Sequence, residues 1–275
     1  MDELAPAPRD QARILRRVGM PGVEALHATF VDYRYALHTH EAHAIALVDR
    51  GAAAFDLEGR RYEASQGSVF VIPAGWAHTG QSASRAGYSY RVLYVDPSAV
   101  IDDLELETRP SPKPPSTVVH HRSRLARTLS AFHDRLAEGE TDLETDELDL
   151  VALAGVVAGL LVGTTMPTPR RIDHAAVRHA VAYLHEHWNR QVTLRQIADH
   201  TSLSPYRLAR IFQREVGLPP STYQRQLRVD HAKGDLRRGL SVAEVALRCG
   251  FYDQAHLTRH FHRMTGVTPL VYARA

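Results

Sequence analysis

Residues 192–223 read VTLRQIADHTSLSPYRLARIFQREVGLPPSTY, and residues 240–272 read LSVAEVALRCGFYDQAHLTRHFHRMTGVTPLVY. The second stretch repeats the first, because the pair Ile197-Ala198 returns as Val245-Ala246 and the later part matches after one inserted residue. The later matches join Leu208, Arg210, Phe212, Arg214, Gly217, Pro220 and Tyr223 to Leu257, Arg259, Phe261, Arg263, Gly266, Pro269 and Tyr272. Each copy predicts a short helix, a tight turn and a longer amphipathic helix that carries arginines, which is the helix-turn-helix pattern.

The first copy carries clear signals for where its helices begin. We expect one helix over about 194–200 and a second from Pro205 to about Val216. Ser204 is a good N-cap for the second helix, and a proline at the first helical position loses no hydrogen bond. The second copy predicts the same unit, with its turn at Gly250-Phe251 and with Asp253 as the N-cap.

Residues 221–238 predict a single helix that joins the two units. At 1.5 Å per residue this helix spans ~27 Å. That length approaches the ~34 Å that separates successive major-groove segments on one face of B-DNA. The spacing therefore suits a chain that places two reading helices in adjacent segments of the major groove.

The longer helix of each copy leaves a polar face once its apolar residues are buried. Arginine and glutamine read base edges through paired hydrogen bonds, and arginine and tyrosine also bind phosphates. Residues 170–275 hold 17 Lys and Arg against 8 Asp and Glu, whereas residues 1–169 hold 16 against 23, so the basic half suits a polyanion. The candidate DNA-binding residues are Tyr206, Arg207, Ala209, Arg210, Gln213 and Arg214 in the first copy and Gln254, Ala255, His256, Thr258 and Arg259 in the second.

Residues 174–275 resemble the tandem helix-turn-helix domain of AraC/XylS-type transcription regulators. The resemblance rests on the repeated Ile-Ala and Val-Ala pairs, on SPYRLARIFQREVG at 204–217 and on RCGFYDQAHLTRHFHRMTGVTPLVY at 248–272. It implies base contacts near the start of each second helix. Alanine stands at 209 and 255, where relatives often carry polar residues, so base reading there reduces to contact with a thymine methyl group.

Residues 23–95 carry the pattern of short strands. The runs EALHATF, AHAIALV, AAAFDL, GSVFVIP and YSYRVLYV alternate with the turn-rich segments DRG, LEGR, ASQG and SASRAG. Strands this short, with no helical pattern between them, predict an antiparallel barrel or jelly roll.

Part of this region resembles the cupin family. GSVFVIPAGWAH at 67–78 reproduces the second cupin motif, Gly-x5-Pro-x-Gly-x2-His, and His38-Thr39-His40 resembles the opening of the first. The likeness spans roughly residues 22–97 and is similar to the effector-binding barrel of the same regulators, which implies a small-molecule effector. The candidate effector-binding residues are Tyr35, His38, His40, Trp76, His78 and Tyr90, with Phe55, Tyr88 and Arg91 as further pocket candidates.

The histidines leave two interpretations open. Cupin metal sites use two histidines and a glutamate of the first motif with the histidine of the second. No carboxylate stands at the required spacing after His40, and His43 is the nearest replacement. One interpretation is an imidazole site for Zn or Fe, made by His38, His40, His43 and His78. The preferred interpretation is a cofactor-free pocket whose histidines exchange hydrogen bonds with a small molecule, while His43 faces solvent.

Two helices are expected between the strands and the basic domain. In the first, Leu125, Leu129, Phe132 and Leu136 form one apolar stripe. In the second, LVALAGVVAGLLV at 150–162 is apolar all round, which favours burial against the barrel, the partner helix or another subunit. The expected domains are a cupin-like effector barrel at 1–112, a helical hairpin for dimerisation at 117–166 and a tandem helix-turn-helix domain at 170–275.

Composition narrows the class of protein. The single cysteine, Cys249, excludes an intramolecular disulfide and fits a reducing compartment. No signal peptide is visible and no apolar run reaches the roughly 20 residues of a membrane span, so we expect a cytoplasmic protein without a membrane partner. The expected function is a homodimeric, effector-responsive transcription regulator without enzymatic activity, and RNA polymerase is left open as a partner. The alternative is a metal-dependent cupin enzyme with an accessory DNA-binding domain, which the missing glutamate disfavours.

Overall fold

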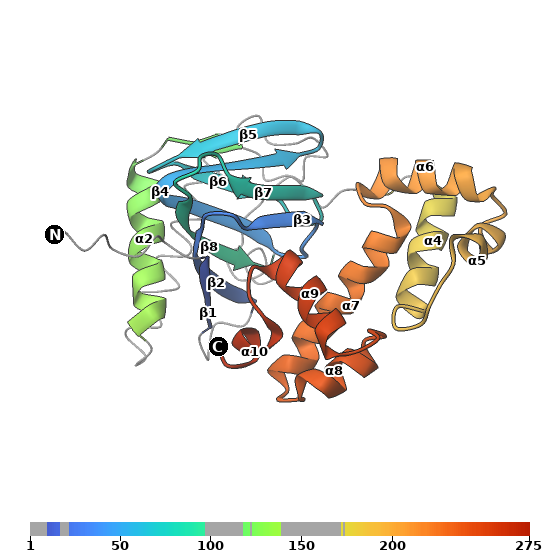
Figure 1. Cartoon of the computed structure of the whole chain (residues 1–275). Coiled ribbons are helices and arrows are strands. Elements are labelled where there is room, and N and C mark those ends of the chain that lie inside the picture. Colours follow the sequence, from blue (N-terminus) through green and yellow to red (C-terminus); the bar gives the residue numbers. More distant parts are fainter. Residues whose placement is uncertain (1–9, 17–21, 97–117, 122, 139–171, 173) are drawn as a thin grey trace, which may run out of the picture. The chain divides into compact units, whose positions relative to one another are not determined.

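The computed structural model describes residues 10–16, 22–96, 118–121, 123–138, 172 and 174–275. Its contacts divide the chain into two compact units. The N-terminal half supplies the first unit, apart from residues 35–40 and 74–79, which group with the second, C-terminal unit. The first unit is rich in strands and the second in helices, as the sequence predicts (Figure 1).

The strand β4 (His43–Leu57) is the centre of the N-terminal sheet. Its partners are β5 (Arg60–Ser65), β6 (Val69–Ile72), β7 (His78–Ser82) and β8 (Tyr88–Val95). The remaining strands are β1 (Gln11–Leu15), β2 (Val23–Phe30), β3 (Arg34–His38) and β9 (Val119–His120). β2 pairs with β8 and β1 with β2, while β3 pairs with β7 and β9 with β6.

An irregularity allows β4 to serve two parts of this sheet. Its register with β8 shifts between Val48 and Arg50, and Gly51 follows directly with a φ of +70°. A Cβ atom at Gly51 would lie 2.4 Å from the carbonyl oxygen of Gly87. Only glycine fits this bulge, because the position needs both a left-handed backbone and a close approach of the neighbouring strand.

The main path of the sheet runs β1–β2–β8–β4–β6–β9. No pairing among the described strands joins the two ends of that path. The sheet-rich N-terminal domain that the sequence predicts is therefore confirmed, whereas a closed barrel is not.

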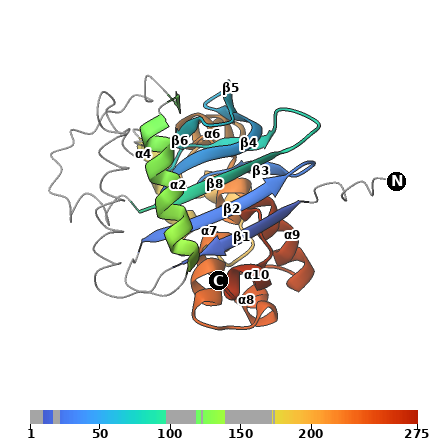
Figure 2. The ribbon, with the colours of Figure 1, turned by 90° about the vertical axis from the view of Figure 1, so that its left-hand side faces the viewer.

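Helix α2 (Ser123–Glu138) lies across one face of the sheet (Figure 2). The expected apolar stripe, which includes Leu129 and Phe132, is fully buried against that face. The sheet residues of the same cluster are Ala25, Ile45, Leu47, Val69, Val71, Leu93 and Val95. The second helix of the expected hairpin, at 142–163, lies outside the described residues.

Seven helices make up the described part of the C-terminal unit. They are α4 (Ala175–Glu186), α5 (Leu194–His200), α6 (Pro205–Val216), α7 (Pro220–Arg237), α8 (Val242–Arg248), α9 (Gln254–Thr265) and α10 (Pro269–Ala273). The pairs α5–α6 and α8–α9 are the two helix-turn-helix units, and α7 joins them (Figure 1). The sequence predicts α5 and α6 at these bounds, and α7 begins and ends one residue earlier than expected.

The expected helix caps form. The Ser204 side chain accepts a hydrogen bond from the backbone N–H of Arg207, and the Asp253 carboxylate accepts one from that of His256 at 2.6 Å. The two short helices start with reciprocal capping boxes, which pair Thr193 with Gln196 in α5 and Ser241 with Glu244 in α8. Local sequence thus specifies where each reading helix begins.

Candidate DNA interface and effector site

The turns of the two units have the same backbone geometry. Ser202 in the first turn and Gly250 in the second both adopt a left-handed conformation, with φ values of +56° and +71°. In each unit, the backbone N–H that follows the turn residue donates to a carbonyl of the short helix of that unit. Leu203 donates to Ala198 in α5, and Phe251 donates to Ala246 in α8. The repeat seen in the sequence is therefore a repeat of hydrogen bonds.

Helix α6 buries one face and exposes the other. Leu208, Ile211, Phe212 and Val216 are buried. Tyr206 is 79% exposed, and Arg207, Arg210, Gln213 and Arg214 are also exposed, while Ala209 is half-buried. All six candidate residues of the first unit thus remain outside the helical core, and four of them carry a charge or an amide that can bind DNA.

Helix α9 repeats this division. Leu257, Phe261 and Met264 are buried, and Gln254, Ala255 and Arg259 are exposed. Thr258 is half-buried, and its hydroxyl donates to the Gln254 carbonyl at 2.8 Å, so its polar atom is partly used within the helix. His256 is half-buried as well. The second helix exposes two arginines, Arg259 and Arg263, at the positions that Arg210 and Arg214 occupy in the first copy.

Arg228 on α7 links the two helix-turn-helix units. Its guanidinium donates to the carbonyls of Trp188 and Arg190, which follow α4, and to the carbonyl of Gly250 in the second turn, at 2.9, 2.6 and 2.7 Å. A Cβ atom at Gly250 would lie 2.1 Å from the Asn189 carbonyl oxygen. The segment after α4 and the second turn are thus in direct contact. These bonds fix the second unit relative to the helices of the first.

An ion cluster joins α7 to α8. The Asp235 carboxylate is nearly fully buried and bonds Arg238 at 2.6 Å and Arg248 at 3.1 Å. Burial raises the pKa of Asp235, but the hydrogen bonds and charges of the two arginines prevail and hold it below its usual value. The sequence analysis did not single out either Arg228 or Asp235, because their partners come from distant segments.

Tyr252 is a surface residue that sequence reasoning missed. It lies in the second turn, directly before the N-cap of α9, and is 87% exposed. The neighbouring Phe251 is buried and acts as the apolar plug of the turn. An aromatic residue at that position gives no signal in the sequence, because either of two adjacent aromatic side chains can be the buried one.

Three of the candidate effector residues form a histidine cluster. The ring of His78 lies 4.2 Å from that of His38 and 4.8 Å from that of His40, measured between centroids. The Tyr35 ring stacks on His38 at 5.5 Å. Trp76 lies two residues before His78, and its indole N–H is buried with no hydrogen-bond partner among the described residues.

Backbone carbonyls orient two of these rings. His38 Nδ1 lies 2.8 Å from the Ala36 carbonyl oxygen, and His78 Nδ1 lies 2.9 Å from that of Trp76. Since a carbonyl only accepts, Nδ1 of His78 carries the proton and its Nε2 presents a lone pair. Burial lowers the pKa of His78 to about 4, and burial together with His78 lowers that of His38 well below its usual value. Both imidazoles are therefore neutral near pH 7.

His43 does not join this cluster. It is 7% exposed, so the expectation that it faces solvent is wrong. Ile45 and Leu47, its neighbours at alternate positions of β4, pack in the cluster with α2, so the alternation of the strand places His43 on that face of the sheet. Burial lowers its pKa to about 4. Among the described residues, no group of three or more histidine, cysteine or acidic side chains is arranged to hold a metal ion.

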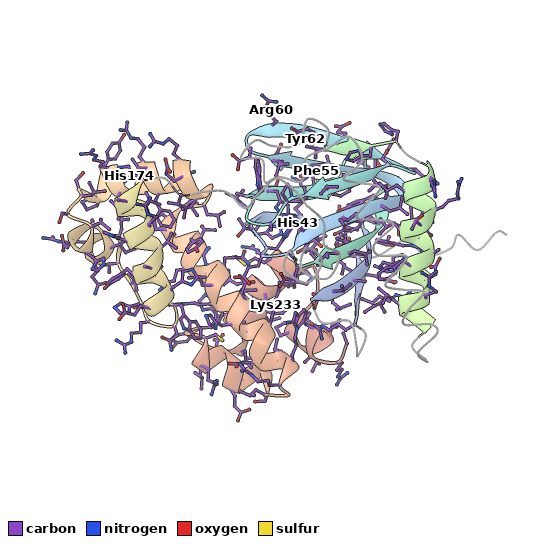
Figure 3. All side chains as sticks on the ribbon, turned by 180° about the vertical axis from the view of Figure 1, so that it is seen from behind. His43, Phe55, Arg60, Tyr62, His174 and Lys233 are labelled. Carbon is purple, nitrogen blue, oxygen red and sulfur yellow. The ribbon has the colours of Figure 1, made fainter. Side chains whose placement is uncertain are left out.

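The remaining pocket candidates are divided between the two faces of the sheet. Arg91 lies on the α2 face, where it bonds Asp49 at 2.9 Å and also Ser130 and Asp134 of α2, so its assignment to a pocket is wrong. Tyr90 alternates with it and belongs to an aromatic cluster with Tyr88 and Phe30. Phe55 stacks between Tyr62 and Phe70 (Figure 3).

Among the described residues, no helix is both long enough and apolar enough to cross a membrane.

Comparison with known proteins assigns both halves of the chain. Residues 20–153 match the family model of the AraC-like ligand binding domain, and residues 197–275 match a helix-turn-helix domain. The HTH-type transcriptional regulator YbfI of Bacillus subtilis is 25% identical over 238 residues, which are 86% of each chain. The HTH-type transcriptional activator RhaS of Escherichia fergusonii is 28% identical over 240 residues, covering 84% of this chain and 85% of that protein.

Solved structures share the fold over nearly the whole length. An apo variant of ToxT from Vibrio cholerae aligns with a TM-score of 0.61 at 12% identity, covering 94% of this chain and 99% of that one. At such low identity the likeness concerns the fold alone. The two domain models agree with the sheet-rich N-terminal half and the repeated helix-turn-helix units. The chain belongs to the AraC family of transcription regulators, with an AraC-type ligand-binding domain followed by a helix-turn-helix DNA-binding domain.

Proposed function

We propose that this regulator recognises double-stranded DNA through the exposed faces of α6 and α9, and that an effector bound in the N-terminal domain alters this binding. The observation that carries the first part is the duplicated surface. Two capped helices present arginines on matching faces, and Arg228 fixes them in one unit. The proposed contact residues are Tyr206, Arg207, Ala209, Arg210, Gln213, Arg214, Gln254, Ala255, His256, Thr258 and Arg259.

We propose a small polar or aromatic molecule as the effector, bound near His38, His40, Trp76 and His78. A neutral His78 offers a hydrogen-bond acceptor at Nε2, and the buried Trp76 indole N–H offers a donor that needs a partner. A ligand that both donates and accepts, such as one with a hydroxyl group, complements this pair. Tyr35 stacks on the same cluster and extends it, and we propose Tyr90, which packs with Tyr88 and Phe30, as a further effector contact. A ToxT structure of the same fold, with a TM-score of 0.55, holds an unsaturated fatty acid.

The rest of the proposal concerns domains and assembly. We propose an effector domain at 1–112, a dimerising hairpin at 117–166 and a DNA-binding domain at 170–275. The support for a homodimer is the all-round apolar segment 150–162, which requires a cover. A regulator of this kind acts on chromosomal DNA in the cytoplasm, and contact with RNA polymerase is one way in which it can act. We assign no reaction and no cofactor to the histidines.

Selection from random duplexes tests the DNA assignment. The full-length protein should enrich one sequence family at about 150 mM salt, with and without a panel of small metabolites. Failure to bind any duplex more tightly than random competitor DNA would contradict the assignment of α6 and α9.

Calorimetry with His78→Ala tests the effector site. The variant should lose binding of any metabolite that the selection identifies, because it removes the Nε2 acceptor, while its DNA binding without effector persists. His185→Ala is a matched control, since His185 is an exposed histidine on α4 outside the cluster. An unchanged effector affinity in His78→Ala would locate the site elsewhere.

A further inference from the structure

The N-terminus of α9 uses its third helical residue differently from α5 and α8. In those two helices the third residue, Gln196 or Glu244, accepts a hydrogen bond from the N-cap backbone N–H. In α9 the third residue is His256. Its Nδ1 atom accepts a hydrogen bond at 3.2 Å from the backbone N–H of Tyr252, one residue before the N-cap. A histidine has taken over a helix-capping position inside the proposed DNA-reading face.

This bond determines where the imidazole carries its proton. A backbone N–H only donates, so Nδ1 of His256 must offer its lone pair. The proton of the neutral ring is therefore on Nε2, which becomes a hydrogen-bond donor. Among the described residues Nε2 has no acceptor. The donor is thus available to a ligand of this surface.

The ring is also held in place. It meets Phe251 edge-on, with centroids 5.4 Å apart, and His260 edge-on at 4.8 Å. The backbone N–H of the same residue is bound by the Asp253 carboxylate. Two rings and one hydrogen bond hold the imidazole, and a second hydrogen bond holds its backbone, so binding through Nε2 loses little side-chain entropy.

The surroundings favour a DNA base as the acceptor. Gln254, Ala255 and Arg259 are exposed around this position. In the major groove, adenine and guanine present N7 as an acceptor and thymine presents O4, whereas cytosine presents only a donor there. One fixed N–H donor complements N7 of either purine, or O4 of thymine, and is repelled by the amino group of cytosine.

We infer that His256 reads a purine in the operator by donating a hydrogen bond from its Nε2–H to the purine N7. This inference rests on the proposed DNA interface and adds the identity of one readout. The second unit then contacts a purine at one position, and discriminates it from cytosine, through a histidine whose tautomer is determined by the protein's own backbone.

Single replacements of purines by their 7-deaza analogues test the inference, because they remove N7 and leave base pairing intact. The operator is first selected with the full-length protein. At one purine, the replacement should weaken binding of the wild-type protein about five- to tenfold, in line with the loss of one good base contact. His256→Ala should bind the natural operator as weakly as the wild type binds the modified one, and should no longer respond to the replacement.

Two controls separate reading from helix capping. His256→Gln keeps a capping side chain, as Gln196 does in α5, and should restore folding stability that His256→Ala loses. Arg259→Ala should lower affinity yet still respond to the same 7-deaza purine. The inference is overturned if an operator is found but no purine shows a His256-dependent response, or if His256→Ala weakens operator and random DNA equally. Absence of any selected operator would instead count against the proposed function.

Discussion

Ser202 and Gly250 occupy the same left-handed position in the two turns, yet only one of them is glycine. A residue with a Cβ atom in this conformation costs about 1 kcal/mol relative to glycine. We expect Ser202→Gly to raise the free energy of unfolding by about 0.5–1 kcal/mol, measured by urea denaturation. Ser202→Ala should give no such gain, because alanine keeps the Cβ atom.

Gly250 should be far less tolerant of substitution. A Cβ atom there would lie 2.1 Å from the Asn189 carbonyl oxygen, and both atoms belong to backbone that cannot turn aside. Gly250→Ala should therefore destabilise the helical unit by several kcal/mol, on the order of the larger core substitutions. Thermal unfolding followed by circular dichroism measures the effect. A change below about 1 kcal/mol would mean that the second turn moves away from α4.

Arg210 and Arg259 are equivalent in the repeat, and both are exposed. We expect alanine at either position to weaken operator binding by ~1–3 kcal/mol and binding to random DNA by much less, since base contacts carry the specificity. Titration of both DNAs at one salt concentration measures the difference. Arg195→Ala on α5, which pairs only weakly with Asp199 at 4.0 Å, is a suitable control. Equal losses on both DNAs would mark the two arginines as phosphate contacts.

At the scale of elements, Arg228 links the segment after α4 to the turn of the second helix-turn-helix unit. Replacing it with alanine removes three hydrogen bonds and leaves the part-buried carbonyls of Trp188 and Gly250 without this donor, at ~1–3 kcal/mol each. The Arg190 carbonyl keeps its hydrogen bond from Gln224. We expect Arg228→Ala to lower the unfolding free energy by about 3 kcal/mol or more, and Arg228→Lys to recover part of it. Denaturant titration provides the measurement. A loss below about 1 kcal/mol would show that other contacts join the units.

The elements differ in how far the sequence predicts them. Ser204 and Pro205 define the start of α6 because capping is a local interaction. The burial of Leu129 and Phe132 follows from helical spacing in the same way. Arg228 escaped prediction because an arginine on a basic helix reads as a surface charge until its distant carbonyl partners are known.

The N-terminal candidates were harder to predict for a similar reason. Arg91 and Tyr90 are adjacent in sequence, so alternation sends them to opposite faces, but nothing in the sequence says which face α2 covers. His43 was misjudged on the same ground. The histidine pair 38 and 78 came together as the motif resemblance implies.

At the scale of the whole molecule, buried neutral histidines make stability depend on pH. Burial lowers the pKa of His43 and of His133 to about 4, against 6.5 in the unfolded chain. The unfolded state therefore takes up protons first, so stability is full above about pH 6.5 and is lost as the pH falls towards 4. We expect the urea midpoint of the N-terminal unit to drop across this window. His133→Gln should flatten the drop, and an identical pH profile in that variant would contradict the assignment.

The hydrogen bonds of Arg228 bear on the spacing of the DNA sites that this regulator can use. If α6 and α9 read adjacent segments of the major groove, as proposed, a fixed link between the two units also fixes the distance between the two DNA half-sites that they bind. About five base pairs inserted between the half-sites turn one of them to the opposite side of the duplex. About ten, one full helical turn, restore the side but increase the distance between the half-sites. The protein thereby sets the spacing of the two half-sites, and a promoter comes under its control only when its half-sites have that spacing.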